Sequence, residues 1–217
     1  MRILAICGSP RGNKSQTKVL AAKTLEAARS QGAEVEMVDL SQGRLEFCRA
    51  CEACHCKPGC ILKDDGTPLL EKMLAVDGLV LASPVYLNQV TAQLKAALDR
   101  TSHFVHCLRL MGKYLAVVTT CGGGGGSDVQ AYLKKYAITV GAQYVGGVDA
   151  KAPLQPADLA AAAALGETLV AAIREKKKFP AQLRGIESQK QYFGKLIAMR
   201  KNQWVFEYQY WKDQGWL

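Results

Sequence analysis

Arg2-Ile-Leu-Ala-Ile-Cys7, followed by Gly8-Ser-Pro-Arg-Gly-Asn-Lys-Ser-Gln-Thr17, is the stretch that decides the fold class. Its first part is a short apolar run, typical of a strand buried on both faces of a parallel sheet. Small and polar residues come next, and a helical pattern runs from about Ser15 to Ser30. A strand, a polar loop and a helix in this order place N–H groups and hydroxyls where they can hold a phosphate. Because the loop matches neither G-x-x-x-x-G-K-[ST] nor G-x-G-x-x-G, a nucleoside triphosphatase and a standard dinucleotide fold are disfavoured.

The rest of the chain continues this alternation of strands and helices. Strands are expected at residues 34–39, 78–82, 114–120 and 143–148, and helices at residues 67–77, 91–108, 129–140 and 156–174. The pattern predicts an α/β fold with a doubly wound, five-stranded parallel sheet. In such sheets ligands bind beyond the carboxyl ends of the strands. Ser9, Tyr86 and the glycine run 122–126 each follow a strand end, and the glycines favour close backbone approach to a ligand or a mobile lid.

Titratable side chains form no visible nucleophile–base pair, so no catalytic residue is predicted. Asp64 and Asp65 are interpreted as loop and cap residues, with Thr67 as the helix cap before Pro68. His103 and His106 are interpreted as surface or interface residues, because no ligand spacing to a carboxylate accompanies them.

Five of the eight cysteines fall in one short segment. Cys48, Cys51, Cys54 and Cys60 are spaced C-x2-C-x2-C-x5-C, and Cys56 is an additional thiol within the run. Closely spaced thiolates favour an iron–sulfur site. A four-cysteine zinc site and free or redox thiols remain alternatives, although zinc sites usually pair two C-x2-C knuckles across a longer separation. Since no signal peptide is apparent, a reducing, cytoplasmic location is expected.

Length and charge indicate one domain with an appendage among the 217 residues. Residues 1–175 are expected to form the main domain, with the cysteine-rich loop 47–62 inserted, and residues 176–217 a C-terminal extension. Residues 174–201 carry nine basic and two acidic residues, or +7 of the net charge of +9. No nucleic-acid-binding motif accompanies them and no apolar run of 18 residues exists, so neither nucleic acid nor a membrane is an expected partner. The aromatic tail from Trp204 to Trp216 is predicted to pack on a partner subunit.

Several motifs together resemble the iron–sulfur flavoproteins, within the flavodoxin-like NAD(P)H-dependent FMN reductase superfamily. The resemblance rests on the following stretches: Gly8-Ser-Pro-Arg11 with Ser15-Gln-Thr17, the cysteine run followed by Lys63-Asp-Asp65, Ser83-Pro-Val-Tyr86 with residues 90–100, residues 119–126 and Tyr210-Trp-Lys-Asp-Gln-Gly-Trp-Leu217. Two departures are visible. Ser15-Gln16-Thr17 stands where many relatives have Gly-Asn-Thr, and Cys56 is a fifth thiol.

The resemblance implies a non-covalent FMN and a [4Fe-4S] cluster. Its implied phosphate ligands are Ser9, Arg11, Ser15, Gln16 and Thr17. The isoalloxazine would lie against Pro84, Val85, Tyr86 and Asn88, with Thr119, Gly122 and Gly123 on its other side. The implied cluster ligands are Cys48, Cys51, Cys54 and Cys60. The resemblance also implies a homodimer or homotetramer, in which the cluster of one subunit lies near the flavin of a neighbour.

An electron-transfer flavoprotein is therefore the leading hypothesis, with a ferredoxin-like protein or a small molecule as its electron partner. One alternative is an NAD(P)H-dependent FMN, quinone or nitroaromatic reductase without a cluster. The other is a zinc-bound module that binds nucleic acid. The sequence leaves open whether NAD(P)H is a substrate.

Overall fold

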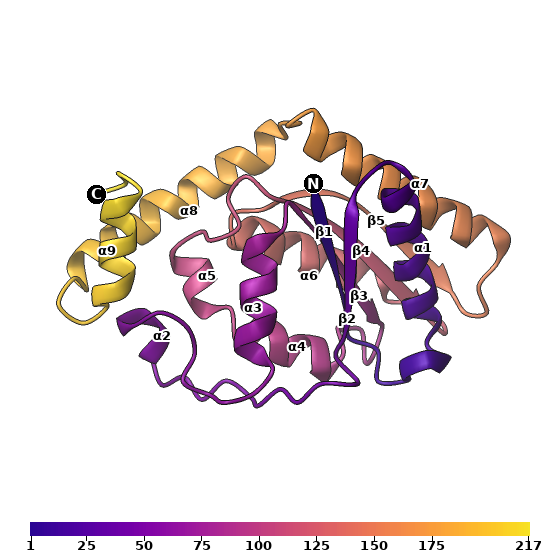
Figure 1. Ribbon diagram of the computed structural model, residues 1–217, viewed down its shortest axis with the longest axis horizontal. Coiled ribbons are helices and arrows are strands. Elements are labelled where there is room, and N and C mark those ends of the chain that lie inside the picture. The colour runs from indigo at the N-terminus through magenta and orange to yellow at the C-terminus, as the bar shows by residue number, and fades with distance from the viewer.

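The computed structural model describes residues 1–217, and its centre is a parallel sheet in the order β2-β1-β3-β4-β5 (Figure 1). The strands are β1 (Arg2–Cys7), β2 (Glu34–Asp39), β3 (Gly78–Pro84), β4 (Tyr114–Cys121) and β5 (Gln143–Lys151). All neighbouring strands are parallel. This order confirms the predicted doubly wound, flavodoxin-like fold.

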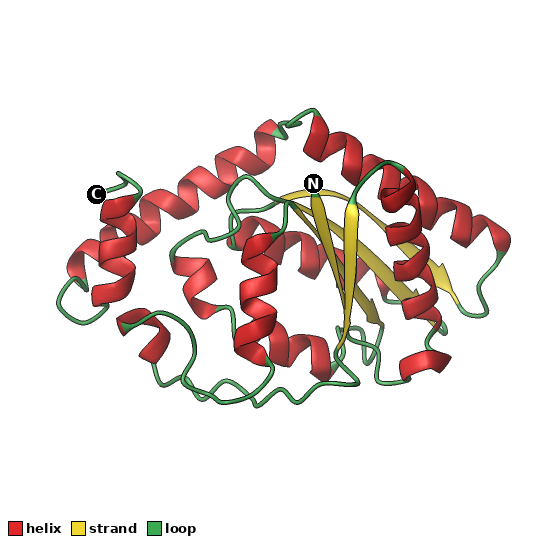
Figure 2. Cartoon of the chain, viewed as in Figure 1, coloured by secondary structure: helices red, strands yellow, loops and turns green.

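Helices cover both faces of the sheet, as Figure 2 shows. One face carries α1 (Gln16–Ser30) and α7 (Pro156–Arg174), and the other carries α3 (Gly66–Ala75), α4 (Ala92–Asp99) and α6 (Gly126–Thr139). Alternate residues of β1 point to opposite layers, so Ile3 packs with α1 and α7 while Leu4 packs with α3 and α4. The two covered faces explain why β1, β3 and β4 are apolar along nearly their whole length.

Helix α7 is long and apolar enough, by length and composition, to cross a membrane. Here it is a layer of the fold, because Leu165, Leu169 and Val170 are buried in the core beside α1 and the sheet. At Gly166 an added Cβ would lie 2.1 Å from the carbonyl oxygen of Thr24, so the two helices approach with no room for a side chain.

Several predicted element boundaries were wrong. The expected helix over residues 91–108 is two helices, α4 and α5 (Ser102–His106), because the chain turns at Arg100 and Thr101. Helix α3 begins at Gly66, so Thr67 is not its cap, and α6 begins at Gly126 instead of residue 129. The cysteine run, in which no element was predicted, contains the short helix α2 (Ala53–Cys56), and a 3-10 turn, η1 (Gly12–Lys14), precedes α1.

The C-terminal extension consists of α8 (Pro180–Met199) and α9 (Val205–Asp213). A separate apolar cluster forms where these helices meet α5, and its buried members are Cys107, Phe193, Ile197, Trp204 and Trp211. Part of the aromatic tail therefore folds back onto its own chain, beside α2 (Figure 1). Packing of the extension on a partner subunit stays a prediction. The side chains left for such a contact include Tyr192 and Met199, which are 65% and 77% accessible.

Candidate functional site

A cavity of about 240 Å³ lies at the carboxyl ends of the strands. Its walls come from the loop after β1, the start of α1 and the ends of β3, β4 and β5. The lining residues are Ser9, Arg11, Ser15, Gln16, Thr17, Pro84, Val85, Tyr86, Thr120, Cys121, Gly122 and Ala152. Nine of the twelve predicted flavin-site residues line it, counting Ser9, Arg11, Ser15, Gln16, Thr17, Pro84, Val85, Tyr86 and Gly122.

The start of α1 gives this cavity its anion-binding chemistry. The Ser15 hydroxyl accepts a hydrogen bond from the Lys18 N–H at 3.0 Å, so Ser15 is the N-cap, and its hydroxyl proton remains available to a ligand. Ser9 and Thr17 are buried with it, no acidic residue lies in the first turn of α1, and Arg11 adds a cation at the rim. Hydroxyls, a cation and the positive end of a helix are the groups that hold a phosphate monoester.

Three of the predicted flavin-site residues lie outside the lining. Asn88 is exposed in the turn after Tyr86, and Gly123 is exposed in the glycine run. The Thr119 side chain points away, because its hydroxyl donates to Asp149 Oδ1 at 2.8 Å.

Thr120 replaces Thr119 in the cavity, since successive residues of a strand face opposite sides. The two hydroxyls of Thr120 and Thr17 lie 2.6 Å apart and join β4 to α1. Cys121 also lines the cavity, and burial raises the pKa of its thiol, so the thiol is protonated at neutral pH. The wall therefore offers hydrogen bonds and no nucleophile.

A second cavity, of about 450 Å³, is formed by the cysteine run. Cys48, Cys51, Cys54 and Cys60 all line it. Cys56 does not, because it lies on the other side of α2 and its thiol donates to the Gln203 carbonyl oxygen at 3.1 Å. The structure thus separates the four predicted ligands from the fifth thiol.

The backbone on either side of Cys51 has an unusual conformation. Ala50 and Glu52, on either side of Cys51, both have left-handed conformations, with φ of 49° and 56°. Such conformations cost roughly 1–3 kcal/mol each for residues other than glycine and persist only where the surroundings impose them. Glu52 is held by the Trp204 indole, whose Nε1 donates to its carboxylate at 3.2 Å.

The Cys54 thiol needs a cationic group to become a ligand. Burial, together with the charges of Glu207, Cys60 and Cys48, raises the pKa of the Cys54 thiol to about 11. Without a metal the thiol therefore stays protonated at neutral pH. A metal ion or cluster displaces such protons, because its positive charge favours the thiolates. This donor set fits an iron–sulfur cluster or zinc.

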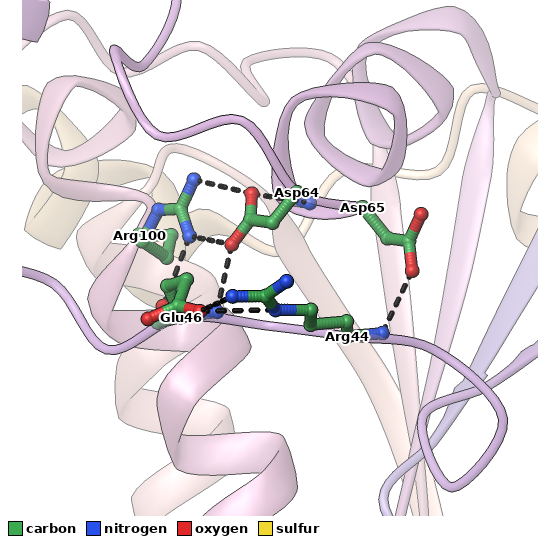
Figure 3. Close-up of polar contacts among 6 residues, drawn as sticks. Arg44, Glu46, Asp64, Asp65 and Arg100 are labelled. Carbon is green, nitrogen blue, oxygen red and sulfur yellow. Dashed lines mark hydrogen bonds and ion pairs between the residues drawn. The ribbon is translucent and has the colours of Figure 1, made fainter.

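Arg100 lines the cysteine cavity and belongs to a buried ion pair, whose contacts Figure 3 shows. Arg100 Nη1 and Nη2 donate to the two carboxylate oxygens of Asp64 at 2.6 and 3.0 Å. Asp64 also accepts from the N–H groups of Glu46 and Gly66. These bonds, that from Arg100 foremost, lower the pKa of Asp64 to about 2. Asp64 thus holds Arg100 and the backbone at both ends of the loop, whereas the sequence indicated only a loop residue.

Asp65 holds the start of the same loop. It precedes α3 at the cap position, but its carboxylate accepts from the Arg44 N–H at 2.7 Å instead of capping the helix (Figure 3). Asp64 and Asp65 together therefore join the two ends of the cysteine-rich loop.

The sequence missed a cluster of two histidines and a glutamate behind α2. Glu207 is fully buried, and its carboxylate oxygens bond to His55 Nδ1 at 2.6 Å and His106 Nδ1 at 3.0 Å. Burial raises the pKa of Glu207, but the bonds to His106 and His55 outweigh this and leave the pKa below its ordinary value. The interpretation of His103 and His106 as surface residues was wrong, and their interpretation as interface residues stays a prediction. His103 is buried, which lowers its pKa to about 4, and His106 stacks on Trp204.

A 2-1-3-4-5 parallel sheet, with a cavity at its carboxyl end whose groups suit a phosphate, places the protein in the flavodoxin-like class. Residues 1–154 match the NADPH-dependent FMN reductase family, and the chain belongs to this family. The protein is accordingly a flavin-dependent oxidoreductase whose cofactor is FMN.

Several relatives are named iron–sulfur flavoprotein. One from Archaeoglobus fulgidus is 33% identical over 227 aligned positions, which cover 100% of both chains. Another, from Methanosarcina thermophila, is 41% identical over 46% of this chain and 52% of its own length.

Solved structures share the fold at lower identity. A WrbA-like flavodoxin from Agrobacterium tumefaciens has a TM-score of 0.60 at 19% identity, covering 81% of this chain and 99% of its own. An apo NADH:FMN oxidoreductase has a TM-score of 0.60 at 21% identity, covering 83% and 92%. These likenesses confirm the fold class.

Proposed function

We propose that the protein is an electron-transfer flavoprotein, which passes electrons between FMN and a [4Fe-4S] cluster held by Cys48, Cys51, Cys54 and Cys60. One observation carries the proposal: these four thiols line one cavity, while the nearby Cys56 thiol is engaged elsewhere. The full-length similarity to a protein named iron–sulfur flavoprotein supports it.

The cofactors supply the chemistry, since a flavin exchanges electrons singly or in pairs and an iron–sulfur cluster exchanges them singly. The chain's own task is to bind and orient. Ser9, Ser15 and the start of α1 hold the phosphate, and Pro84 and Tyr86 border the ring side of the cavity. No carboxylate or histidine lines the flavin cavity, so no residue is assigned to move a proton there.

The two cavities share no lining residue, and Figure 1 shows α2 at the opposite end of the molecule from the start of α1. This separation supports a homodimer or homotetramer, in which the cysteine loop of one subunit approaches the flavin of another. Exposed apolar side chains support the same assembly, since Phe47 beside the cysteines is 73% accessible and Leu87 beside the flavin cavity is 98% accessible. We further propose a cytoplasmic location and a ferredoxin-like or small-molecule electron partner.

A second candidate function is favoured by the family match over residues 1–154. An NAD(P)H-dependent FMN, quinone or nitroaromatic reductase would need the flavin cavity alone. Its cysteines would then be empty or hold zinc.

The test is anaerobic purification, followed by an absorption spectrum and assays of iron, acid-labile sulfide, zinc and FMN. We expect FMN together with iron and sulfide in similar amounts, and flavin bands over a broad shoulder. FMN with neither iron nor sulfide would contradict the electron-transfer proposal. Catalytic reduction of the bound flavin by NADPH in such a preparation would establish the reductase.

A further inference from the structure

Arg100 stands in the wall of the cysteine cavity with one donor unused. The residue is 3% accessible and lines the cavity together with Cys60. Its Nε–H is buried and has no hydrogen-bond partner. Buried N–H groups are nearly always paired, so an unpaired one beside a ligand cavity indicates a partner that arrives with the ligand.

The remainder of the guanidinium is fixed. Nη1 donates to Asp64 and to the Glu46 carbonyl oxygen at 2.9 Å, and Nη2 donates to Asp64 (Figure 3). Gly66 lies flat against the group, because a Cβ added there would be 2.7 Å from Nη2. The guanidinium therefore has little freedom to turn Nε–H toward another acceptor.

Sulfur is an acceptor that the cavity offers, because four thiols line it. Cys60 and Arg100 line the same cavity, so a cluster held by Cys60 would bring sulfur to the wall in which the guanidinium stands. A hydrogen bond from N–H to a ligating sulfur, and a positive charge nearby, both favour the more negative, reduced form of an iron–sulfur cluster.

We propose that Arg100 is a positioning residue of the cluster, whose Nε–H donates to a cluster sulfur at Cys60 and raises the reduction potential, while Asp64 holds the guanidinium in place and opposes its charge. This inference rests on the proposed function. It predicts changes of opposite sign in the reduction potential when Arg100 and Asp64 are replaced. Loss of the donor lowers the potential, and loss of the opposing carboxylate raises it.

The experiment uses the anaerobically purified, full-length holoprotein. Wild type, Arg100→Lys, Asp64→Asn and Arg44→Gln are first assayed for iron and sulfide, and the cluster's midpoint potential is then measured by redox titration. Lys keeps the cation but lacks the planar Nε–H donor. Arg44 is a matched control, because it lies just before the cysteine-rich loop and pairs with Glu46 but does not line the cavity.

We expect R100K to lower the ratio of reduced to oxidised cluster about tenfold at a fixed ambient potential. For a one-electron couple, this is a fall of about 59 mV in the midpoint potential. D64N should raise the potential, and R44Q should leave it near that of wild type. Equal potentials in R100K, D64N and wild type would overturn the inference. So would shifts in the same direction for R100K and D64N, or loss of the cluster from both, which a purely structural role predicts. Absence of iron and sulfide from wild type would instead refute the proposed function, and this inference with it.

Discussion

His55 Nδ1 lies 2.6 Å from Glu207 Oε1, and this contact attaches the C-terminal helix α9 to the cysteine loop. Two further bonds join the same segments, from the Trp204 indole to Glu52 and from the Cys56 thiol to Gln203. The extension is therefore part of the cysteine site within one chain. It determines how α2, which carries Cys54, is oriented.

Replacing Glu207 with Gln tests this attachment. The substitution keeps the size of the side chain but removes the charge and replaces one of the two acceptors with an amide donor, so the bonds to the two histidines lose their charge assistance. We expect the free energy of unfolding to fall by about 1–3 kcal/mol. Urea unfolding of the purified protein measures it. Glu187→Gln is the matched control, because Glu187 is exposed on α8. A loss of the same size in both variants would show that the buried cluster adds no stability.

Local sequence pattern predicted the sheet well and the contacts between distant segments poorly. Each strand is an apolar or alternating run whose signal lies entirely within six to nine residues. The break between α4 and α5 carries no such signal, because residues 91–108 are amphipathic throughout. Arg100 turns there to meet Asp64, 36 residues earlier in the chain. Likewise, nothing near His55 in the sequence indicates a partner 152 residues away.

The same limit applies within the sites. Spacing identified the four cysteines, but the cavity lining and the bond to Gln203, which only the structure shows, distinguish Cys56 from them. The exchange of Thr119 for Thr120 has a different cause. Strand β4 is buried along its whole length, so it shows no alternation of apolar and polar residues. Without alternation, the sequence does not reveal which of two adjacent threonines faces the cavity.

Acid should reduce the stabilisation that Asp64 provides. Its pKa in the folded protein is about 2, below the 3.8 of an ordinary aspartate, so folding favours the ionised form. This contribution, about 2 kcal/mol, is complete above the ordinary pKa and is lost as the pH falls through about 2. The unfolding free energies of wild-type and Asp64→Asn apoprotein should therefore converge between about pH 4 and pH 2. A constant difference across this range would contradict the assignment.

Cys56 should be dispensable for metal binding. Cys56→Ser keeps a hydroxyl donor for the Gln203 carbonyl oxygen and changes nothing in the cavity wall, so we expect the iron and sulfide content of wild type. Cys54→Ser removes a cavity thiol, and the cluster should be lost while FMN remains bound, because the flavin cavity shares no residue with this one. Anaerobic iron, sulfide and FMN assays measure both variants. Equal loss of iron from C56S and C54S would show that Cys56 is also needed for metal binding.

Thr120 and Thr119 form a matched pair for the flavin site. Thr120→Val removes the hydroxyl that lies 2.6 Å from the Thr17 hydroxyl in the cavity wall. We expect FMN affinity to fall about tenfold, or about 1.4 kcal/mol, in fluorescence titrations of the apoprotein. Thr119→Val removes a hydroxyl that serves Asp149 outside the cavity, so it should cost about 1 kcal/mol of stability but leave FMN affinity within about twofold. If T119V weakened FMN binding as much as T120V, the cavity at the end of β4 would not be the flavin site as described. The assignment of Thr120 as the threonine that faces the flavin would then be wrong.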